Sequence, residues 1–442
     1  MVLLTALGPC FHSGELPYQV LGTSLLLGHV LGYRLAARAA GWLLPTALLL
    51  PLLLAGLRGL NPELSMAARV LLGSCLAVLA TAPLAHLTLR WWARLGTQPG
   101  GLARLYSLEM AGAALGLGLA VALGPRGLLL AFPSIVTVSL GLVEKRLWSL
   151  GVLALLSSLA LAPLEHWAQQ RCYPGGKVLA AAYSPYQLVE VVEMQGQPQL
   201  FLNGLCHHNM TDLKQLNYYL AELPAELLGS PEGKKALILG GGGFLSARET
   251  VRRGLQTTVV ELDPRVAELS LRWIAGSSPP DYRVEVTDAR QFTSQGESFD
   301  LIVFSLPYPY SLNVASLFTR EYFSRLSENL KPGGIVTVFL GNPVRQGRLD
   351  RASAGFLRAL RQAFPHAVGV SSGECDNTVV LATRESPLKV EDVYRRLKQD
   401  RRHQFSILDG PALDRLCAGV QAASLSNLQA CWYLNLQLWG WR

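Results

Sequence analysis

The sequence predicts an α-helical domain that crosses a membrane several times, followed by an α/β domain with a largely parallel sheet. Half of the 442 residues are hydrophobic and only 16% are charged, against roughly a quarter charged in soluble proteins. The charge deficit lies in residues 17–165, which are dominated by Leu, Ala and Gly. After about residue 170, short apolar strands alternate with amphipathic helices, the pattern of a parallel sheet covered by helices.

Six apolar runs are long enough, at about 18–25 residues each, to cross a bilayer. The runs are residues 17–37, 41–60, 66–89, 105–123, 125–143 and 147–165. We therefore expect a membrane domain of about six helices over residues 1–168, with the lipid bilayer as a partner. His29, His86 and Glu109 lie inside these runs, where ionisable groups can serve a proton relay or transport, although each is near enough to a run's end to reach the interface.

The basic residues and the cysteines exclude two other classes of protein. The net charge of +8 comes in part from arginines in short loops between the apolar runs, so membrane orientation explains it better than nucleic-acid binding, which needs a basic stripe with interleaved aromatics. The seven cysteines include no C-x-x-C pair, so we expect no metal site and no disulfide framework.

The soluble part begins with a β-rich segment over residues 175–205. Residues 188–194 and 199–203, joined through Gly196, predict a β-hairpin. Strands and helices then alternate over residues 206–385. Strands are expected in KALILGGGGF, TTVVELD, YRVEVTDAR, FDLIVFSLP and IVTVFL, and helices in SARETVRRGL, PRVAELSLRWI and FTREYFSRLSENL, the last closed by KPGG. This alternation predicts a Rossmann-like domain of the methyltransferase type, with a helical extension over residues 386–442.

Three groups of residues at successive strand ends predict a nucleoside site. The glycines 240–243 come where the first strand turns into its helix, so the backbone can approach a ligand closely. Glu261 ends the second strand about twenty residues later, where a carboxylate can accept both ribose hydroxyls. Asp288 ends the third strand and is placed to contact the adenine.

These motifs resemble the spermidine synthase family, the aminopropyltransferases. GGGG, VVELDPRV and TDAR match its glycine loop and the next strand ends, and SPYQ and LFLNG match its N-terminal strands. Bacterial members carry several spans ahead of the catalytic domain, so the resemblance implies a bacterial inner (plasma) membrane protein. It also implies S-adenosylmethionine, or the decarboxylated form, as cofactor. The residues implied to bind it are Gln187, Gly240, Gly241, Gly242, Gly243, Glu261, Asp263, Asp288 and Ala289.

The sequence departs from the family where carboxylates handle cationic amines. The family's glycine loop reads GGGDG, and its aspartate position is Gly243 here. The two aspartates of the family's D-x-x-D-P loop correspond to Ser305 and Tyr308, and the glutamine after LNG is His207. We take His207, Ser305 and Tyr308 as candidate catalytic residues. His207 is the best general base of the three, although a surface histidine in a polar turn explains it equally well.

These departures lead us to expect a membrane-anchored transferase that uses intact S-adenosylmethionine on a non-polyamine acceptor, such as a lipid or another small molecule. One alternative is a polyamine aminopropyltransferase that uses the decarboxylated donor. Another is a non-catalytic membrane scaffold or sensor that retains the nucleoside pocket. A homodimer remains open. Basic residues in the loops weakly place the soluble domain outside the cytoplasm, but its donor is made in the cytoplasm, so we expect the domain on that side.

Overall fold

The computed structural model covers the 442-residue chain. It describes residues 15–34, 37–97, 150–208, 216–275, 281–307, 311–341, 348–372, 377–399 and 405–428, with residues 309 and 344 and scattered residues between 100 and 135. The chain forms two compact units. One comprises Met1–Gln195 and Leu202–Leu205, and the other Gly196–Phe201 and Cys206–Arg442.

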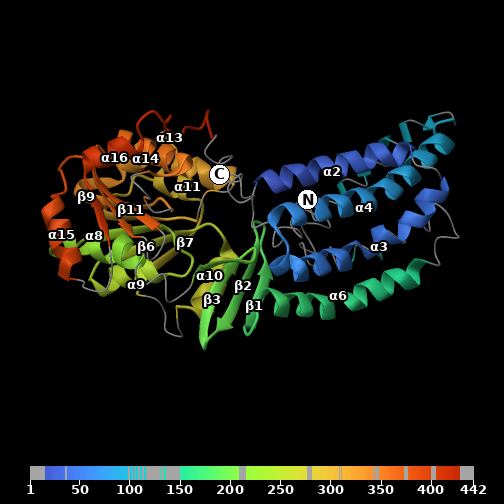
Figure 1. Ribbon diagram of the computed structural model, residues 1–442, viewed down its shortest axis with the longest axis horizontal. Coiled ribbons are helices and arrows are strands. Elements are labelled where there is room, and N and C mark those ends of the chain that lie inside the picture. Colours follow the sequence, from blue (N-terminus) through green and yellow to red (C-terminus); the bar gives the residue numbers. More distant parts are fainter. Residues whose placement is uncertain are drawn as a thin grey trace. The chain divides into compact units, whose positions relative to one another are not determined.

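Long helices build most of the first unit (Figure 1). They are α2 (Glu15–Arg34), α3 (Ala37–Leu60), the short η1 (Asn61–Glu63), α4 (Met66–Leu95) and α6 (Gly151–Cys172). Helix α4 packs against α2 and α3, and α3 also packs against α6. Small residues allow this close approach, since a Cβ at Gly32 of α2 would come within 2.8 Å of the Ala85 side chain on α4. Between α6 and α3, the buried Ser157 hydroxyl donates to the Leu48 carbonyl at 3.0 Å.

Two helices among the described residues are long and apolar enough to cross a membrane. They are Met66–Arg90, with a mean hydropathy of 1.9, and Gly151–Cys172, with a mean hydropathy of 1.3. Helices α2 and α3 cover the first two predicted runs. The runs at 105–123 and 125–143 lie almost entirely outside the described residues. The number of spans therefore stays a prediction.

A buried ionic cluster joins helices and strands within the first unit. Strand β1 (Lys177–Tyr183) pairs antiparallel with β2 (Leu188–Met194). Glu190 of β2 has no exposed surface, and its two carboxylate oxygens accept from Arg58 Nη2 of α3 at 2.6 and 2.7 Å. The Tyr173 hydroxyl donates at 2.7 Å and Gln169 Nε2 at 3.3 Å. Because every partner is a donor, the carboxylate can remain charged away from water.

An eight-stranded sheet forms the centre of the second unit. Its strands are β5 (Lys235–Gly240), β6 (Gln256–Glu261), β7 (Arg283–Val286), β8 (Phe299–Ser305), β9 (Leu330–Phe339), β10 (His366–Ser372), β11 (Asn377–Thr383) and β12 (Ser406–Leu408). Their order is β12-β10-β11-β9-β8-β5-β6-β7. Strands β9-β8-β5-β6-β7 are parallel, whereas β11 is antiparallel to β9 and β10. The five parallel strands confirm the largely parallel sheet of a Rossmann-like domain that the sequence predicted.

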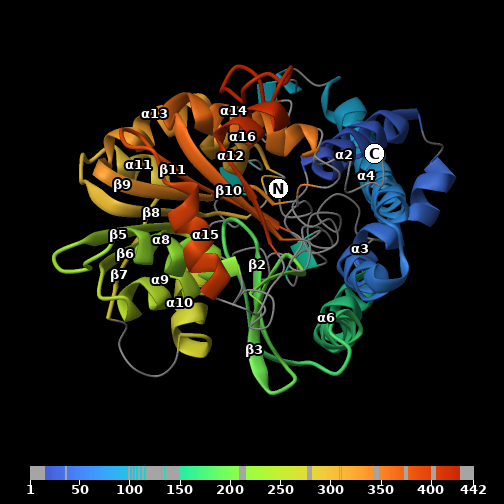
Figure 2. The ribbon, with the colours of Figure 1, turned by 60° about the vertical axis from the view of Figure 1, so that its left-hand side comes forward.

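Helices cover both faces of this sheet (Figure 2). One face packs against α11 (Ala289–Thr293), α13 (Arg320–Glu328), α14 (Arg351–Ala363) and α16 (Gly410–Leu416). The other packs against η3 (Tyr218–Glu222), α8 (Leu223–Leu227), α9 (Leu245–Arg252), α10 (Pro264–Trp273) and α15 (Val390–Gln399). Strand β5 shows the division, because Leu237 and Leu239 enter the first core while Ala236 and Ile238 enter the second.

Short elements complete the unit. Strand β3 (Gln197–Leu202) follows β2 through Gln195 and Gly196, both at positive φ (52° and 75°), as a two-residue hairpin turn requires. Strand β4 (Leu205–His208) comes next. Helices α12 (Leu312–Ala315) and η4 (Ser316–Phe318) lie between β8 and α13.

The structure differs from the sequence prediction at three places. The units divide after Gln195 instead of between 168 and 175, because Glu190 is bonded to α3 and α6. The predicted helical extension 386–442 also contributes β12, which pairs with β10. The KPGG segment lies inside β9, where the pairing with β8 shifts between Phe299 and Leu301.

Breaking the Arg58–Glu190 pair should destabilise the chain strongly. In Glu190→Ala a buried guanidinium loses its carboxylate, so we expect unfolding to become easier by about 3–5 kcal/mol. Replacing both residues, as Arg58→Met with Glu190→Leu, removes both charges and should cost far less. The control is Arg171→Ala, because the Arg171–Glu63 pair is exposed and should change stability by about 1 kcal/mol or less. Chemical denaturation of the full-length chain measures all three, and equal losses in Glu190→Ala and the control would contradict this account.

Candidate functional site

The candidate site lies at the carboxyl ends of the parallel strands. Strand β5 lies between β6 and β8, and the chain crosses β5 when it passes from β7 to β8. Ligands of open parallel sheets bind at such a point because the loops on its two sides diverge. Gly240 is paired with Ser305 across β5 and β8, and the backbone N–H of Thr287 donates to the Glu261 carbonyl at 3.0 Å. The ends of β5, β6, β7 and β8 therefore form one edge.

The glycine loop needs its glycines. Gly240 and Gly241 have φ of 76° and 75°, in the left-handed region that side chains disfavour. A Cβ on Gly240 would come within 2.7 Å of the Ser305 carbonyl oxygen, and one on Gly242 within 2.5 Å of Val266 Cγ1. The loop thus presents bare backbone at the start of α9, and this is the cradle that a nucleoside needs.

Phe244 ends the glycine loop in an unusual conformation. Its φ is 57° and its side chain is 1% exposed. A side chain in this region costs roughly 1–2 kcal/mol. The ring packs against that of Tyr282 in the core, with 5.6 Å between the ring centroids, and this packing offsets the strain. Sequence analysis missed Phe244, although an aromatic residue directly after four glycines was a visible signal.

Glu261 is a carboxylate without a cationic partner among its described contacts. It is half-buried at the end of β6, and its Oε1 accepts the backbone N–H of Asp263 at 3.0 Å. Its Oε2 lies 3.6 Å from where a Gly242 Cβ would stand. Desolvation at this edge raises the pKa of Glu261 to about 7, against a smaller opposing effect of backbone hydrogen bonds. A costly carboxylate beside a bare loop is typical of a binding site.

Asp263 and Ala289 support the loops of the site. Asp263 is 2% exposed and its Oδ1 accepts the backbone N–H of Arg265 at 2.9 Å, which caps α10. Ala289 is the first residue of α11 and is buried. The structure therefore gives Asp263 a structural role that the sequence prediction did not include.

Asp288 is held by Arg290, which the sequence analysis also missed. The Asp288 carboxylate caps α11 by accepting the Arg290 backbone N–H at 2.8 Å. It also accepts the guanidinium, with Nη2 to Oδ2 at 2.6 Å. These hydrogen bonds keep the pKa of Asp288 below its usual range. Arg290 Nη1 donates onward to Ser316 Oγ at 3.2 Å.

The remaining predicted residues are distributed more widely. Ser305 ends β8, and its Oγ lies 3.3 Å from where a Gly241 Cβ would stand. His207 is half-buried in β4, and Gln187 belongs to the first unit, where its backbone N–H donates to Ser184 Oγ at 3.0 Å. Tyr308 lies outside the described residues. The structure thus brings together the glycine loop, Glu261, Asp288 and Ser305.

The ionisable residues of the apolar runs form no relay among the described residues. His29 is exposed, and its Nδ1 is 2.9 Å from the Leu25 carbonyl. His86 is buried, with no hydrogen-bond partner for either ring nitrogen within the described chain. Glu109 lies outside the described residues.

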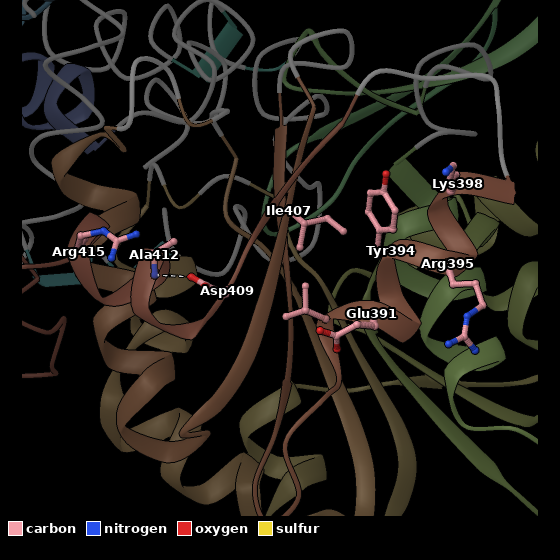
Figure 3. A pocket seen from close by; sticks show the side chains of 9 residues that line it. Glu391, Tyr394, Arg395, Lys398, Ile407, Asp409, Ala412 and Arg415 are labelled. Atoms are coloured by element: carbon pink, nitrogen blue, oxygen red, sulfur yellow. Dashed lines mark hydrogen bonds between the residues drawn. The ribbon is translucent and has the colours of Figure 1, made fainter.

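A groove of about 1190 Å³ lies elsewhere in the second unit (Figure 3). Helix α15 lines it with Glu391, Tyr394 and Lys398, β12 with Ile407, and α16 with Arg415. The groove lies at the β12 edge of the sheet, and strands β10, β11 and β9 separate β12 from β8. It is therefore not part of the candidate site.

Part of the second unit is similar to known proteins. Residues 216–367 match the spermine/spermidine synthase domain. The chain is 32% identical over 171 residues to a polyamine aminopropyltransferase of Oceanobacillus iheyensis, covering 36% of this chain and 33% of that protein. It is 32% identical over 195 residues to polyamine aminopropyltransferase 1 of Streptomyces coelicolor, covering 41% and 36%. The match thus spans about a third of each of these relatives.

The chain was also compared with solved structures. A spermidine synthase in complex with the transition state analogue AdoDATO is 18% identical with a TM-score of 0.45, covering 55% of this chain and 85% of that one. The spermidine synthase of Thermotoga maritima is also 18% identical, with a TM-score of 0.43, covering 55% and 84%. The domain match and the curated relatives show that the second unit is similar to the spermidine synthase-like family and carries its spermine/spermidine synthase domain over residues 216–367.

Proposed function

We propose that this protein is a membrane-anchored aminopropyltransferase that uses decarboxylated S-adenosylmethionine as donor and a polyamine as acceptor. The observation that carries this proposal is the Glu261 carboxylate beside a bare glycine loop, in a domain whose curated relatives are polyamine aminopropyltransferases. Those relatives favour this alternative over the non-polyamine or lipid acceptor that the sequence departures led us to expect, and they give that expectation no support.

The described residues fit the nucleoside part of such a donor. Glu261 offers carboxylate oxygens to the ribose hydroxyls, and binding there replaces the water that the half-buried group lacks. Gly240, Gly241 and Gly242 leave space that side chains would fill. Asp288 Oδ2 can accept a hydrogen bond from the base. Each of these groups lies at the same edge of the sheet.

The transfer step needs only two contributions from the protein. The bound donor supplies an electrophilic carbon next to a sulfonium, so an amine nitrogen forms the N–C bond as the C–S bond breaks and the sulfonium becomes a thioether. The chain must orient the amine and take one proton from it. His207 is the candidate proton acceptor, and the Ser305 hydroxyl at the end of β8 can orient the amine by accepting a hydrogen bond.

A second candidate is transfer from intact S-adenosylmethionine, and one specific observation favours it. Residue 243 carries no side chain, so no carboxylate grips the lone amine of the decarboxylated donor. A carboxylate there would also repel the carboxylate of the intact donor, by up to roughly 4 kcal/mol at about 4 Å and an effective dielectric of 20. Gly243 removes that repulsion.

Product analysis tests the proposed function. Full-length protein is incubated with an aliphatic diamine and decarboxylated donor labelled in its propyl chain, and in parallel with intact donor labelled in its methyl group. We expect label from the propyl chain on the diamine and none from the methyl group. Methyl transfer alone would support the second candidate, and no transfer from either donor would leave the scaffold interpretation.

Gly243→Asp tests which donor the loop prefers. The added carboxylate should strengthen binding of the decarboxylated donor and weaken binding of the intact one, each by about tenfold or more, because a charge-assisted hydrogen bond contributes about 1.5–3 kcal/mol. Calorimetry with both donors measures the shift. Gly296→Asp is the control, since Gly296 has open space around it, its φ of 77° is in a region that Asp tolerates, and it precedes β8 at the opposite edge. If the relative affinity for the two donors changed equally in both variants, the change would be due to net charge and not to the position of the carboxylate.

We propose that the first unit anchors the protein in the inner membrane with the second unit on the cytoplasmic side. Two long apolar helices and the further apolar runs support this. The chain should remain with membranes through a carbonate wash and be released by detergent. Release by carbonate alone would show that the protein is not integral. Protease added to sealed inside-out vesicles should digest the second unit if it faces the cytoplasm.

Glu261 should link donor binding and stability to pH. Since its pKa is raised to about 7, the folded protein keeps the proton that the unfolded chain loses near pH 4.5, so this stability is present at low pH and disappears as pH rises through about 7. Glu261→Gln should therefore be more stable than the unmodified protein at pH 8, by about 1–3 kcal/mol. Its free energy of nucleoside binding should become less favourable by about 2–3 kcal/mol. Thermal unfolding and adenosine calorimetry at pH 6 and 8 test both, and equal stability at pH 8 would contradict the raised pKa.

A further inference from the structure

Arg290 makes a more elaborate contact with Asp288 than an ordinary surface ion pair. Its Nε donates to Oδ1 at 3.0 Å and its Nη2 donates to Oδ2 at 2.6 Å, so the guanidinium and the carboxylate meet side by side. The backbone N–H of the same residue donates to Oδ1 at 2.8 Å. The third nitrogen, Nη1, donates to Ser316 Oγ at 3.2 Å. Asp288 is therefore fixed by one residue that is itself fixed from another loop.

Stability does not account for this arrangement. The Arg290 side chain is 43% exposed and that of Asp288 22%, and ion pairs with such solvent access contribute little to folding. Ser316 belongs to η4, in the segment that follows β8. Its own hydroxyl donates to the Asn313 carbonyl at 2.7 Å, which leaves the oxygen lone pairs directed at Arg290. Helix α11 after β7 and η4 after β8 are thus joined through a single guanidinium.

The hydrogen bonds determine what Asp288 can still accept. Each carboxylate oxygen has two lone pairs. Oδ1 already accepts the Arg290 backbone N–H and Nε. Oδ2 accepts Nη2 at 2.6 Å and shares the single Nε hydrogen with Oδ1, at the longer distance of 3.2 Å. Oδ2 is therefore the oxygen with acceptor capacity left for a ligand, and the guanidinium fixes its direction.

A fixed hydrogen-bond acceptor at Asp288 Oδ2 can distinguish adenine from hypoxanthine. Adenine presents an exocyclic amine, a donor that this oxygen can accept. Hypoxanthine has a carbonyl oxygen at the same position, so two acceptors would face each other and both would lose hydrogen bonds to water. If Asp288 were free to rotate, it could turn away from the carbonyl, and the difference between the bases would shrink.

We propose that Arg290 is a specificity-determining residue, which holds Asp288 so that its remaining acceptor selects adenine over hypoxanthine. Ser316 is a positioning residue in this scheme, because it holds the guanidinium. The proposal rests on the proposed function only in taking the ligand to be an adenine nucleoside. It adds the residue that enforces base selection, which sequence motifs alone do not assign.

Calorimetry with adenosine and inosine on the full-length protein tests it. The unmodified protein should prefer adenosine, and Arg290→Met should lower the adenosine-to-inosine affinity ratio by about tenfold, the effect of one charge-assisted hydrogen bond. Arg290→Lys keeps the positive charge but loses the paired N–H donors of the guanidinium. Its adenosine-to-inosine affinity ratio should therefore lie above that of Arg290→Met and below that of the unmodified protein. Ser316→Ala keeps the ion pair but frees the guanidinium, and its ratio should fall between the two extremes.

Arg283→Met provides the matched control. Arg283 lies on β7, is exposed, and pairs with Glu285 two residues away, as Arg290 pairs with Asp288. Its replacement should leave the ratio unchanged. A merely structural role for Arg290 would weaken both nucleosides equally, and an unchanged ratio in Arg290→Met would overturn the proposal. If that variant does not fold, the ratios of Arg290→Lys and Ser316→Ala decide. Failure of the unmodified protein to bind either nucleoside would instead contradict the proposed function.

Discussion

The backbone of β5 leaves the sheet against the Ser305 carbonyl of β8, so closely that a Cβ on Gly240 would come within 2.7 Å of that oxygen. The loops that follow β5 and β8 diverge from this edge, where a ligand can lie between them. Only glycine allows the turn and the close approach together, since φ is 76° at Gly240 and 75° at Gly241. The proposed nucleoside contacts lie at the same edge, because Glu261 ends the neighbouring strand β6 and Asp288 lies two residues beyond the end of β7.

Glu190, which is buried, and Glu261, which is half-buried, differ in how far hydrogen-bond donors stabilise their negative charge. Glu190 in the first unit is surrounded by donors, with Arg58, Tyr173 and Gln169 all bonded to its carboxylate. Glu261 in the second unit accepts backbone N–H groups, and its pKa is raised to about 7. The first arrangement stabilises the charge and fixes helices to a strand. The second leaves the charge costly, as is usual at sites where binding and stability compete.

The candidate site lacks carboxylates that the resembled family uses for amines. Gly243 stands where the family has the aspartate for the donor's amine, and Ser305 stands where it has an aspartate for the acceptor's amine. The relatives are nonetheless polyamine aminopropyltransferases over the matched third of their length. The proposed aminopropyl transfer is compatible with these substitutions if neutral groups and His207 suffice to orient an acceptor amine that reaches the site uncharged. This explanation requires less electrostatic attraction of the acceptor, and therefore weaker acceptor binding.

The sequence by itself determined the parallel strands β5–β9 and the glycine loop, because continuous apolar runs and glycines act through local backbone preference and burial. It also placed Glu261 and Asp288 at strand ends, since order along the chain sets order across a parallel sheet. Only the tertiary structure decided that Arg58 meets Glu190, which is 132 positions away, and that β12 joins the sheet edge. It alone showed that Arg290 holds Asp288. These contacts depend on side-chain directions and on long-range pairing, and neither leaves a periodic signal in the chain.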